Sequence, residues 1–102
     1  MLFSYSLQLN AVDQEIYGLN INYKTMPCRV GITTNPTERK AYWQNQVIGL
    51  TNWRILATYN NKADAQAHEN RHALSHGCTA QAGGPNAPGV WSVYKFDYIR
   101  TR

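Results

Sequence analysis

This sequence contains no apolar run that approaches the roughly 20 residues of a membrane-spanning helix, so no membrane partner is expected. It has only two cysteines, Cys28 and Cys78, which are too few for the disulfide framework of a small secreted domain. We expect both to be buried free thiols, and a bridge between them is the alternative. The first residues lack the basic and apolar segments of a signal peptide. The prediction is therefore a cytoplasmic protein.

Acidic residues are also scarce. The chain has six Asp and Glu and ten Lys and Arg, which gives a formal net charge of +4. A basic excess is compatible with a nucleic-acid partner, either DNA or RNA. Apolar residues make up 43% of the 102 residues, which indicates a folded chain and not a disordered one. This length predicts a single domain over residues 1–102 with one modest core. The pattern leaves the oligomeric state open.

Apolar residues alternate with polar ones in several segments, as is typical of half-buried strands. The strands predicted in this way cover residues 3–9, 16–23, 28–34, 53–59 and 90–98. Residues 16–23 and 28–34 follow each other so closely that they should pair as an antiparallel hairpin. Residues 79–89 are rich in glycine and proline, and they are predicted to form a loop.

Two segments carry the signals of helices. Asn35 is followed by Pro36, a typical cap and first helical position, and this helix is expected to end near residues 47–48. A second helix is predicted over residues 62–76, after an asparagine cap and before Gly77 at its C-terminal end. The fold class is therefore α+β, a small, mainly antiparallel β-sheet flanked by two main helices.

Residues 68–72 fit the pattern H-E-x-x-H, in which two imidazoles one helical turn apart bind a single zinc ion. The glutamate between them activates a water molecule in such enzymes. His76 lies one further turn along the helix. A zinc hydrolase with His68, His72 and His76 as ligands is the weaker functional alternative, and a polar helix face with unrelated histidines is the more ordinary interpretation.

A second set of residues resembles the GIY-YIG nuclease family. The points of likeness are the pair Ile16-Tyr17, the pair Val30-Gly31 in the next strand, and Arg39, which follows that glycine by eight residues (39 − 31 = 8). Glu69 lies on the helix that follows the third strand, as the glutamate of that family does. The likeness covers roughly residues 15–98, which is nearly the whole chain.

The resemblance implies a metal-dependent endonuclease that cleaves phosphodiesters. Glu69 would bind Mg²⁺ or Mn²⁺, Arg39 would hold the scissile phosphate, and Tyr17 would position or deprotonate the attacking water. Arg29 replaces the second signature tyrosine, and an arginine stays protonated and cannot act as a base. Slow cleavage and binding without cleavage both stay open. A third hypothesis is an inactive protein-interaction module that has kept the nuclease fold.

Three residues within or next to residues 30–43 are further candidates for contact with nucleic acid. Arg29 and Lys40 would face phosphate groups. Trp43 lies one helical turn after Arg39, which makes it the best candidate among the tryptophans for stacking on a base. The more ordinary interpretation of the tryptophans is that they belong to the core.

Overall fold

The computed structural model describes residues 26–81 and 83–102. Its elements in chain order are β1 (Cys28–Thr33), α1 (Pro36–Gln46), β2 (Val47–Ile48), β3 (Thr51–Tyr59), α2 (Lys62–His76), β4 (Thr79–Gln81), β5 (Trp91–Asp97) and β6 (Arg100–Thr101). The strands predicted over 3–9 and 16–23, and Tyr17 with them, lie outside the described residues. Neither helix of the described part has the length and apolar character needed to cross a membrane.

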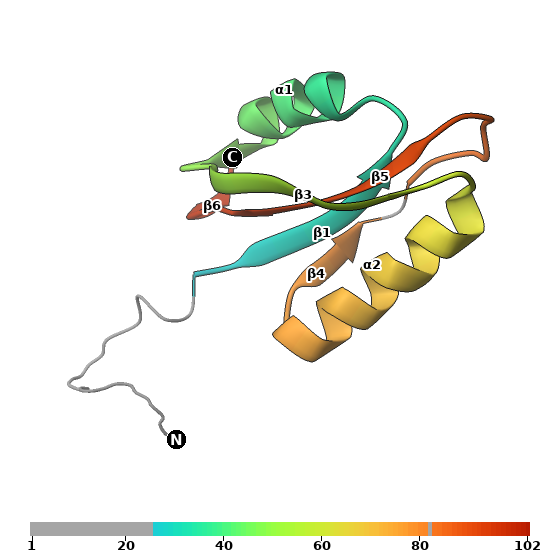
Figure 1. Cartoon of the computed structure of the whole chain (residues 1–102). Coiled ribbons are helices and arrows are strands. Elements are labelled where there is room, and N and C mark those ends of the chain that lie inside the picture. The colour runs from blue at the N-terminus through green and yellow to red at the C-terminus, as the bar shows by residue number, and fades with distance from the viewer. Residues whose placement is uncertain (1–25, 82) are drawn as a thin grey trace.

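Four strands form one mixed, mostly antiparallel sheet in the order β3-β5-β1-β4. The central strand β5 pairs antiparallel with both β1 and β3, whereas β4 runs parallel to β1 at one edge. The short strands β2 and β6 form a separate antiparallel pair. Helices α1 and α2 lie on opposite faces of the main sheet (Figure 1). The fold is therefore α+β with two helices on a mostly antiparallel sheet, as predicted.

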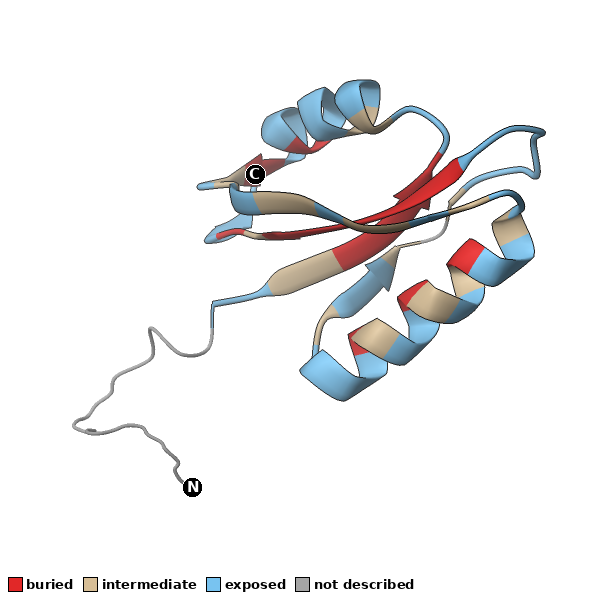
Figure 2. Ribbon diagram, viewed as in Figure 1, coloured by how far each residue is buried: buried red, intermediate tan, exposed pale blue. Residues whose placement is uncertain are grey.

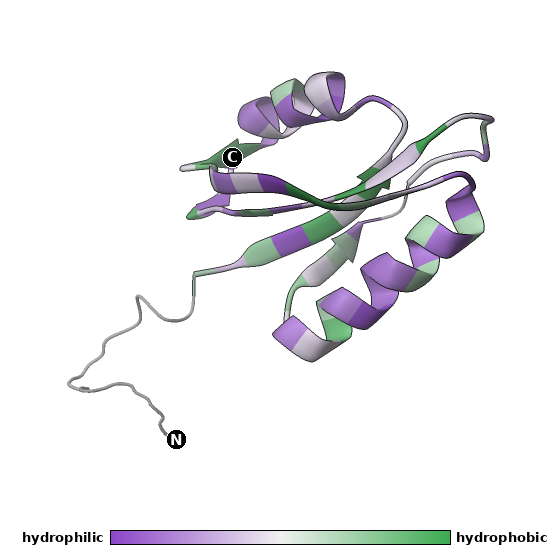
Figure 3. Cartoon of the chain, viewed as in Figure 1, coloured by the Kyte–Doolittle hydropathy of each residue, from purple (hydrophilic) through white to green (hydrophobic). Residues whose placement is uncertain are grey.

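Each face of the sheet has its own core. Figure 2 shows that burial concentrates on β1 and β5 and along one side of α2. Figure 3 shows apolar residues on the strands and largely hydrophilic helices, so the strands supply most of the core. The buried cluster on the α2 side consists of Val30, Ile32, Ala65, Ala73, Trp91 and Val93. The buried cluster on the α1 side consists of Trp43, Val47, Tyr94, Phe96 and Tyr98.

The predicted helix caps are confirmed. The side chain of Asn35 accepts a hydrogen bond from the amide N–H of Glu38 at 3.1 Å, which satisfies a donor at the start of α1. Asn61 does the same for the amide of Asp64 at the start of α2. Gly77 ends α2 with φ of 68°, in the left-handed region that favours glycine.

Two predicted boundaries were wrong. β4 lies in the segment predicted as a loop, because its residues extend the sheet beside β1. α1 ends at Gln46, just before the predicted end, since Val47 and Ile48 leave the helix to pair with β6. The hairpin expected between 16–23 and 28–34 involves residues outside the described part of the chain. Among the described strands, β1 pairs antiparallel with β5 and parallel with β4.

The two cysteines form a disulfide bond, which corrects the expectation of free thiols. The Cα atoms of Cys28 and Cys78 lie 4.8 Å apart, and the bridge spans 50 residues of sequence. It ties the first residue of β1 to the turn between α2 and β4. The cytoplasmic location was inferred partly from the cysteine count, and it stays a prediction.

We expect loss of this bond to lower the free energy of unfolding by about 2–4 kcal/mol, because a bridge across a long loop restricts the unfolded chain. Urea unfolding of the oxidised protein and of the double variant Cys28→Ser/Cys78→Ser measures the difference. Wild type treated with dithiothreitol is the matched control, since it keeps the native sequence without the bond. Equal unfolding midpoints for the oxidised and reduced wild type would contradict the prediction.

Candidate nucleic-acid interface

Arg29 lies between two aromatic rings on the α1 side of the sheet. Its guanidinium carbon Cζ is 5.0 Å from the centroid of the Trp43 ring and 5.6 Å from that of Tyr98. Nη1 donates a 3.0 Å hydrogen bond to Oε1 of Gln81, and Nε is buried without a hydrogen-bond partner among the described residues. The guanidinium is thus a half-buried cation whose hydrogen bond goes to an uncharged amide. Such a cation is stabilised when an anion approaches it.

Tyr94 packs directly over Gly31, at the centre of the same face. A Cβ atom added at Gly31 would overlap the hydroxyl and ring of Tyr94, so only glycine allows this approach. Nε1 of Trp43 donates a 2.9 Å hydrogen bond to the Tyr94 hydroxyl oxygen. The ring of Trp53 stacks on the ring of Tyr94, with centroids 4.8 Å apart. These contacts fix the phenol in one orientation.

Burial raises the pKa of Tyr94 above its usual value of 10.0. The hydrogen bond from Trp43 and the charges of Arg39 and Arg29 oppose this rise, whereas the charge of Glu69 adds to it. The phenol therefore stays protonated at neutral pH, and its hydroxyl hydrogen is available for donation. The phenol packs in the buried cluster on the α1 side of the sheet.

The half-buried Arg39 and the exposed Tyr42 form the outer part of this face. Arg39 lies one turn before Trp43, and its Cζ is 5.2 Å from the centroid of the Tyr42 ring. The two side chains line an open hollow together with Glu38. Tyr42 is 46% exposed, whereas Trp43 is only 5% exposed. Trp43 therefore lies in the core and holds Arg29, and Tyr42 is the aromatic ring that a base can reach. Lys40 is exposed on the same helix.

Glu69 is fully buried on the sheet side of α2. Its Oε1 accepts a 2.5 Å hydrogen bond from Nε2 of Gln66, and its Oε2 accepts a 2.8 Å bond from the amide N–H of Gln81. Burial raises the pKa of Glu69 above its usual 4.5, although these two bonds and the charge of Lys62 oppose the rise. Glu69 has no exposed surface, so Mg²⁺ or Mn²⁺ could reach its carboxylate as predicted only if the neighbouring side chains moved.

Gln81 connects the glutamate to the arginine. Its main-chain N–H bonds to Glu69, and its side-chain oxygen bonds to Arg29. Gln81 was not predicted as a site residue, because its segment was predicted as a loop. Tyr94 and Tyr42 were not predicted as site residues either. Tyr94 carried a signal, since it lies in the predicted strand 90–98, but the pairing of that strand with β1 was not foreseen.

The H-E-x-x-H segment forms no metal site in the described part of the chain. Nδ1 of His68 is hydrogen-bonded to the Tyr59 hydroxyl at 2.8 Å, and Nε2 of His72 lies 3.0 Å from Nζ of Lys95. The lysine ammonium thus occupies a nitrogen that a zinc ion would need, and Glu69 points to Gln81 instead. No group of three or more His, Cys, Asp or Glu side chains is placed to hold a metal there.

No protein-family model matches this chain, and neither a curated protein nor a solved structure matches it. The resemblance to the GIY-YIG family is therefore an expectation that rests on the residues given for it. A function has to be argued from the geometry of the site itself.

The substitution Glu69→Gln is expected to stabilise the fold at pH 8 and to leave it unchanged below about pH 4.5. A buried carboxyl with a raised pKa ionises more readily in the unfolded chain, so wild type loses stability as the pH rises from 4.5 through the folded pKa. The amide does not ionise, and it still offers an oxygen to Gln81. Urea unfolding of both proteins from pH 4 to pH 8 measures the difference.

The matched control is Glu38→Gln, which removes an exposed carboxylate from the first turn of α1. This control should show no gain in stability at pH 8, because the carboxylate there favours the helix N-terminus. A Glu69→Gln variant that is less stable than wild type at pH 8 would contradict the prediction.

Proposed function

We propose that this domain binds the phosphates of nucleic acid with the α1 side of its sheet. The observation that carries the proposal is the Arg29 guanidinium, which is held by the Trp43 and Tyr98 rings and hydrogen-bonds to an uncharged amide. Its position is fixed before any ligand arrives, so little conformational entropy is lost when a phosphate binds. Arg39 adds a second guanidinium on the neighbouring helix.

The outer residues of α1 complete a surface suited to a single strand. Arg39 and Lys40 supply charge for the phosphate backbone, and the 46% exposed ring of Tyr42 offers a stacking surface for a base. Arginine suits this role because its planar donors match the oxygens of a phosphate. The formal net charge of +4 favours the approach of a polyanion. DNA and RNA both fit this chemistry.

Cleavage of the bound strand is the second candidate function, and the position of Tyr94 favours it. Its hydroxyl lies over Gly31, on the strand that pairs antiparallel with β1. The family resemblance implies such a tyrosine at residue 17, on a strand that was predicted to pair antiparallel with the β1 segment. Binding is the better supported function, because Glu69 is enclosed by its hydrogen bonds and Tyr94 stays protonated at neutral pH.

The proposal is tested by fluorescence anisotropy with labelled single-stranded DNA and RNA at 50 and 200 mM salt. Wild type should bind more weakly at the higher salt, because phosphate contacts release counterions. Arg39→Ala and Tyr42→Ala should each raise Kd about tenfold. Lys40→Ala should reduce the slope of log Kd against log salt concentration by about 1, the value for one phosphate contact. The same samples with Mg²⁺ or Mn²⁺ test for cleavage.

Arg71→Ala is the matched control, since it removes an exposed arginine from α2 on the opposite face of the sheet. Binding that Arg71→Ala weakens as much as Arg39→Ala does would mean nonspecific attraction by net charge. Absence of binding to all the strands would overturn the proposal and favour the protein-interaction module. Cleavage lost in both Tyr94→Phe and Glu69→Gln would establish the second candidate function.

A further inference from the structure

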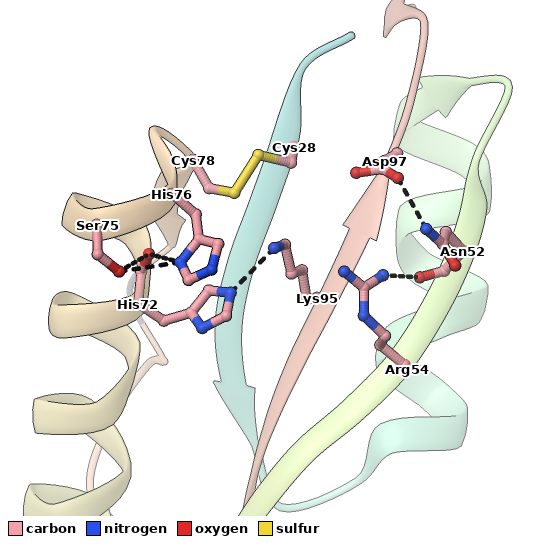
Figure 4. The surroundings of a disulfide bond; sticks show 9 residues. All are labelled: Cys28, Asn52, Arg54, His72, Ser75, His76, Cys78, Lys95 and Asp97. Carbon is pink, nitrogen blue, oxygen red and sulfur yellow. Dashed lines mark hydrogen bonds between the residues drawn. A yellow bond between two sulfur atoms is a disulfide. The ribbon is translucent and has the colours of Figure 1, made fainter. Parts of the chain in front are cut away.

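A second group of cationic side chains lies on the other face of the sheet, under α2. We call it the basic cluster, and its members are Arg54 of β3, Lys95 of β5, and His72 and His76 of α2. Figure 4 shows these side chains gathered near the disulfide, with Lys95 between His72 and Arg54. The cluster is separated from Arg39 and Tyr42 by the sheet, because α1 and α2 cover opposite faces (Figure 1).

Lys95 is the centre of the basic cluster and is only 8% exposed. Its Nζ lies 3.0 Å from Nε2 of His72. An ammonium group has no acceptor, so His72 must accept this bond, and its imidazole is neutral with the proton on Nδ1. Buried lysines are ordinarily paired with a carboxylate. Here the partner is a neutral ring, which leaves the positive charge of Lys95 without an opposite charge in direct contact.

The neighbours of Lys95 add positive charge to the same place. Arg54 is its direct cross-strand partner, and two like charges in that register repel each other. The Arg54 guanidinium donates to the carbonyl oxygen of Asn52 at 2.7 Å and not to a carboxylate. Asp97 is the acidic group whose charge acts on Lys95, and its Oδ2 accepts a 3.1 Å hydrogen bond from Asn52.

The two histidines of the basic cluster lie against each other, and His72 can add further charge when it binds a proton. The rings of His72 and His76 are stacked with centroids 3.9 Å apart, and Nδ1 of His76 donates to the carbonyl oxygen of His72 at 3.1 Å. Burial lowers the pKa of His72 from 6.5, and the charges of Lys95, His76, His68 and Arg54 lower it further. Each of these effects disfavours the protonated ring in the ligand-free protein.

We propose that the basic cluster is a binding site for a tetrahedral oxyanion of the phosphate class. The anion takes the place of His72 as the acceptor for the Lys95 ammonium and also receives hydrogen bonds from Arg54 and His76. His72 then takes up a proton from solvent, so binding is coupled to proton uptake. The anion brings a negative charge into direct contact with Lys95, whereas the Asp97 carboxylate acts on it without such a contact, and it lessens the repulsion between Lys95 and Arg54.

The first test replaces sodium chloride by sodium phosphate or sodium sulfate at constant ionic strength and pH 6. Binding should raise the thermal midpoint of unfolding by about 2–5 °C at saturation, because the anion binds only the folded state. NMR titration of the imidazole C–H signals should show the pKa of His72 rising in phosphate, because the anion offsets the charges and burial that lower it. Equal midpoints in chloride, phosphate and sulfate would overturn the proposal, because they would mean that the anions act only through their ionic strength, which is held constant.

Variants assign the effect to the basic cluster. Lys95→Met should abolish the stabilisation, and Arg54→Gln and His76→Asn should each reduce anion affinity about fivefold or more. The last two residues lie nearer the surface, so these variants keep the test valid if Lys95→Met does not fold. Arg71→Gln is the control, because it removes an exposed arginine of α2 that does not belong to the basic cluster, and it should leave the shift unchanged. An unchanged shift in Arg54→Gln and His76→Asn would contradict the proposed site.

The source of the anion is distinguished by a short oligonucleotide with and without a 5′-phosphate. Tighter binding of the phosphorylated strand, lost in Arg54→Gln, would assign a terminal phosphomonoester. Saturation by inorganic phosphate without any such preference would assign the free ion. Both results support the site, and neither depends on nucleic-acid binding at α1. Failure of the proposed function therefore appears in Arg39→Ala and Tyr42→Ala, and failure of this inference appears in the variants of the basic cluster.

Discussion

The close packing of Tyr94 on Gly31 is the contact on which the rest of this structure depends. It joins the two central strands β5 and β1, and a side chain at position 31 would displace the ring of Tyr94. The same phenol accepts the hydrogen bond from Trp43, which anchors α1 to the sheet. Trp43 in turn supports the guanidinium of Arg29. A substitution at this contact would therefore disturb the packing of the sheet, the position of α1 and the support of Arg29 together.

Local features of the sequence predicted the helices well. The asparagine caps and the glycine after α2 act within one helical turn, so their effect is visible in the sequence itself. The alternation over 53–59 and 90–98 likewise predicted β3 and β5 within two residues at each end. Pairing between distant segments was not predictable in the same way. The edge strand β4, the pair β2–β6 and the disulfide each depend on where the chain returns after a helix or a long loop.

The candidate site was predicted in part. Arg29 contacts the ring of Trp43, and Arg39 lies one turn before Trp43 on α1 and contacts the ring of Tyr42. The exposure of the two rings differs from the prediction. Trp43 points into the core and Tyr42 outward, although they are adjacent in sequence, because neighbouring helix positions differ by about 100°. The same rotation separates Glu69 from the adjacent His68. The H-E-x-x-H pattern predicts that these residues lie close together on one helix, but their hydrogen-bond partners differ because the residues differ in burial.

The order of the strands has a consequence for how the chain folds. β1 is the first described strand and β5 nearly the last, yet they are neighbours, and Cys28 pairs with Asp97 at a separation of 69 residues (97 − 28 = 69). β5 also completes the edge of β3. The central pairing can therefore form only after residue 97 has left the ribosome, and closing so long a loop slows folding. Until then, the apolar faces of β1 and β3 have no strand between them, and the nascent chain is open to aggregation.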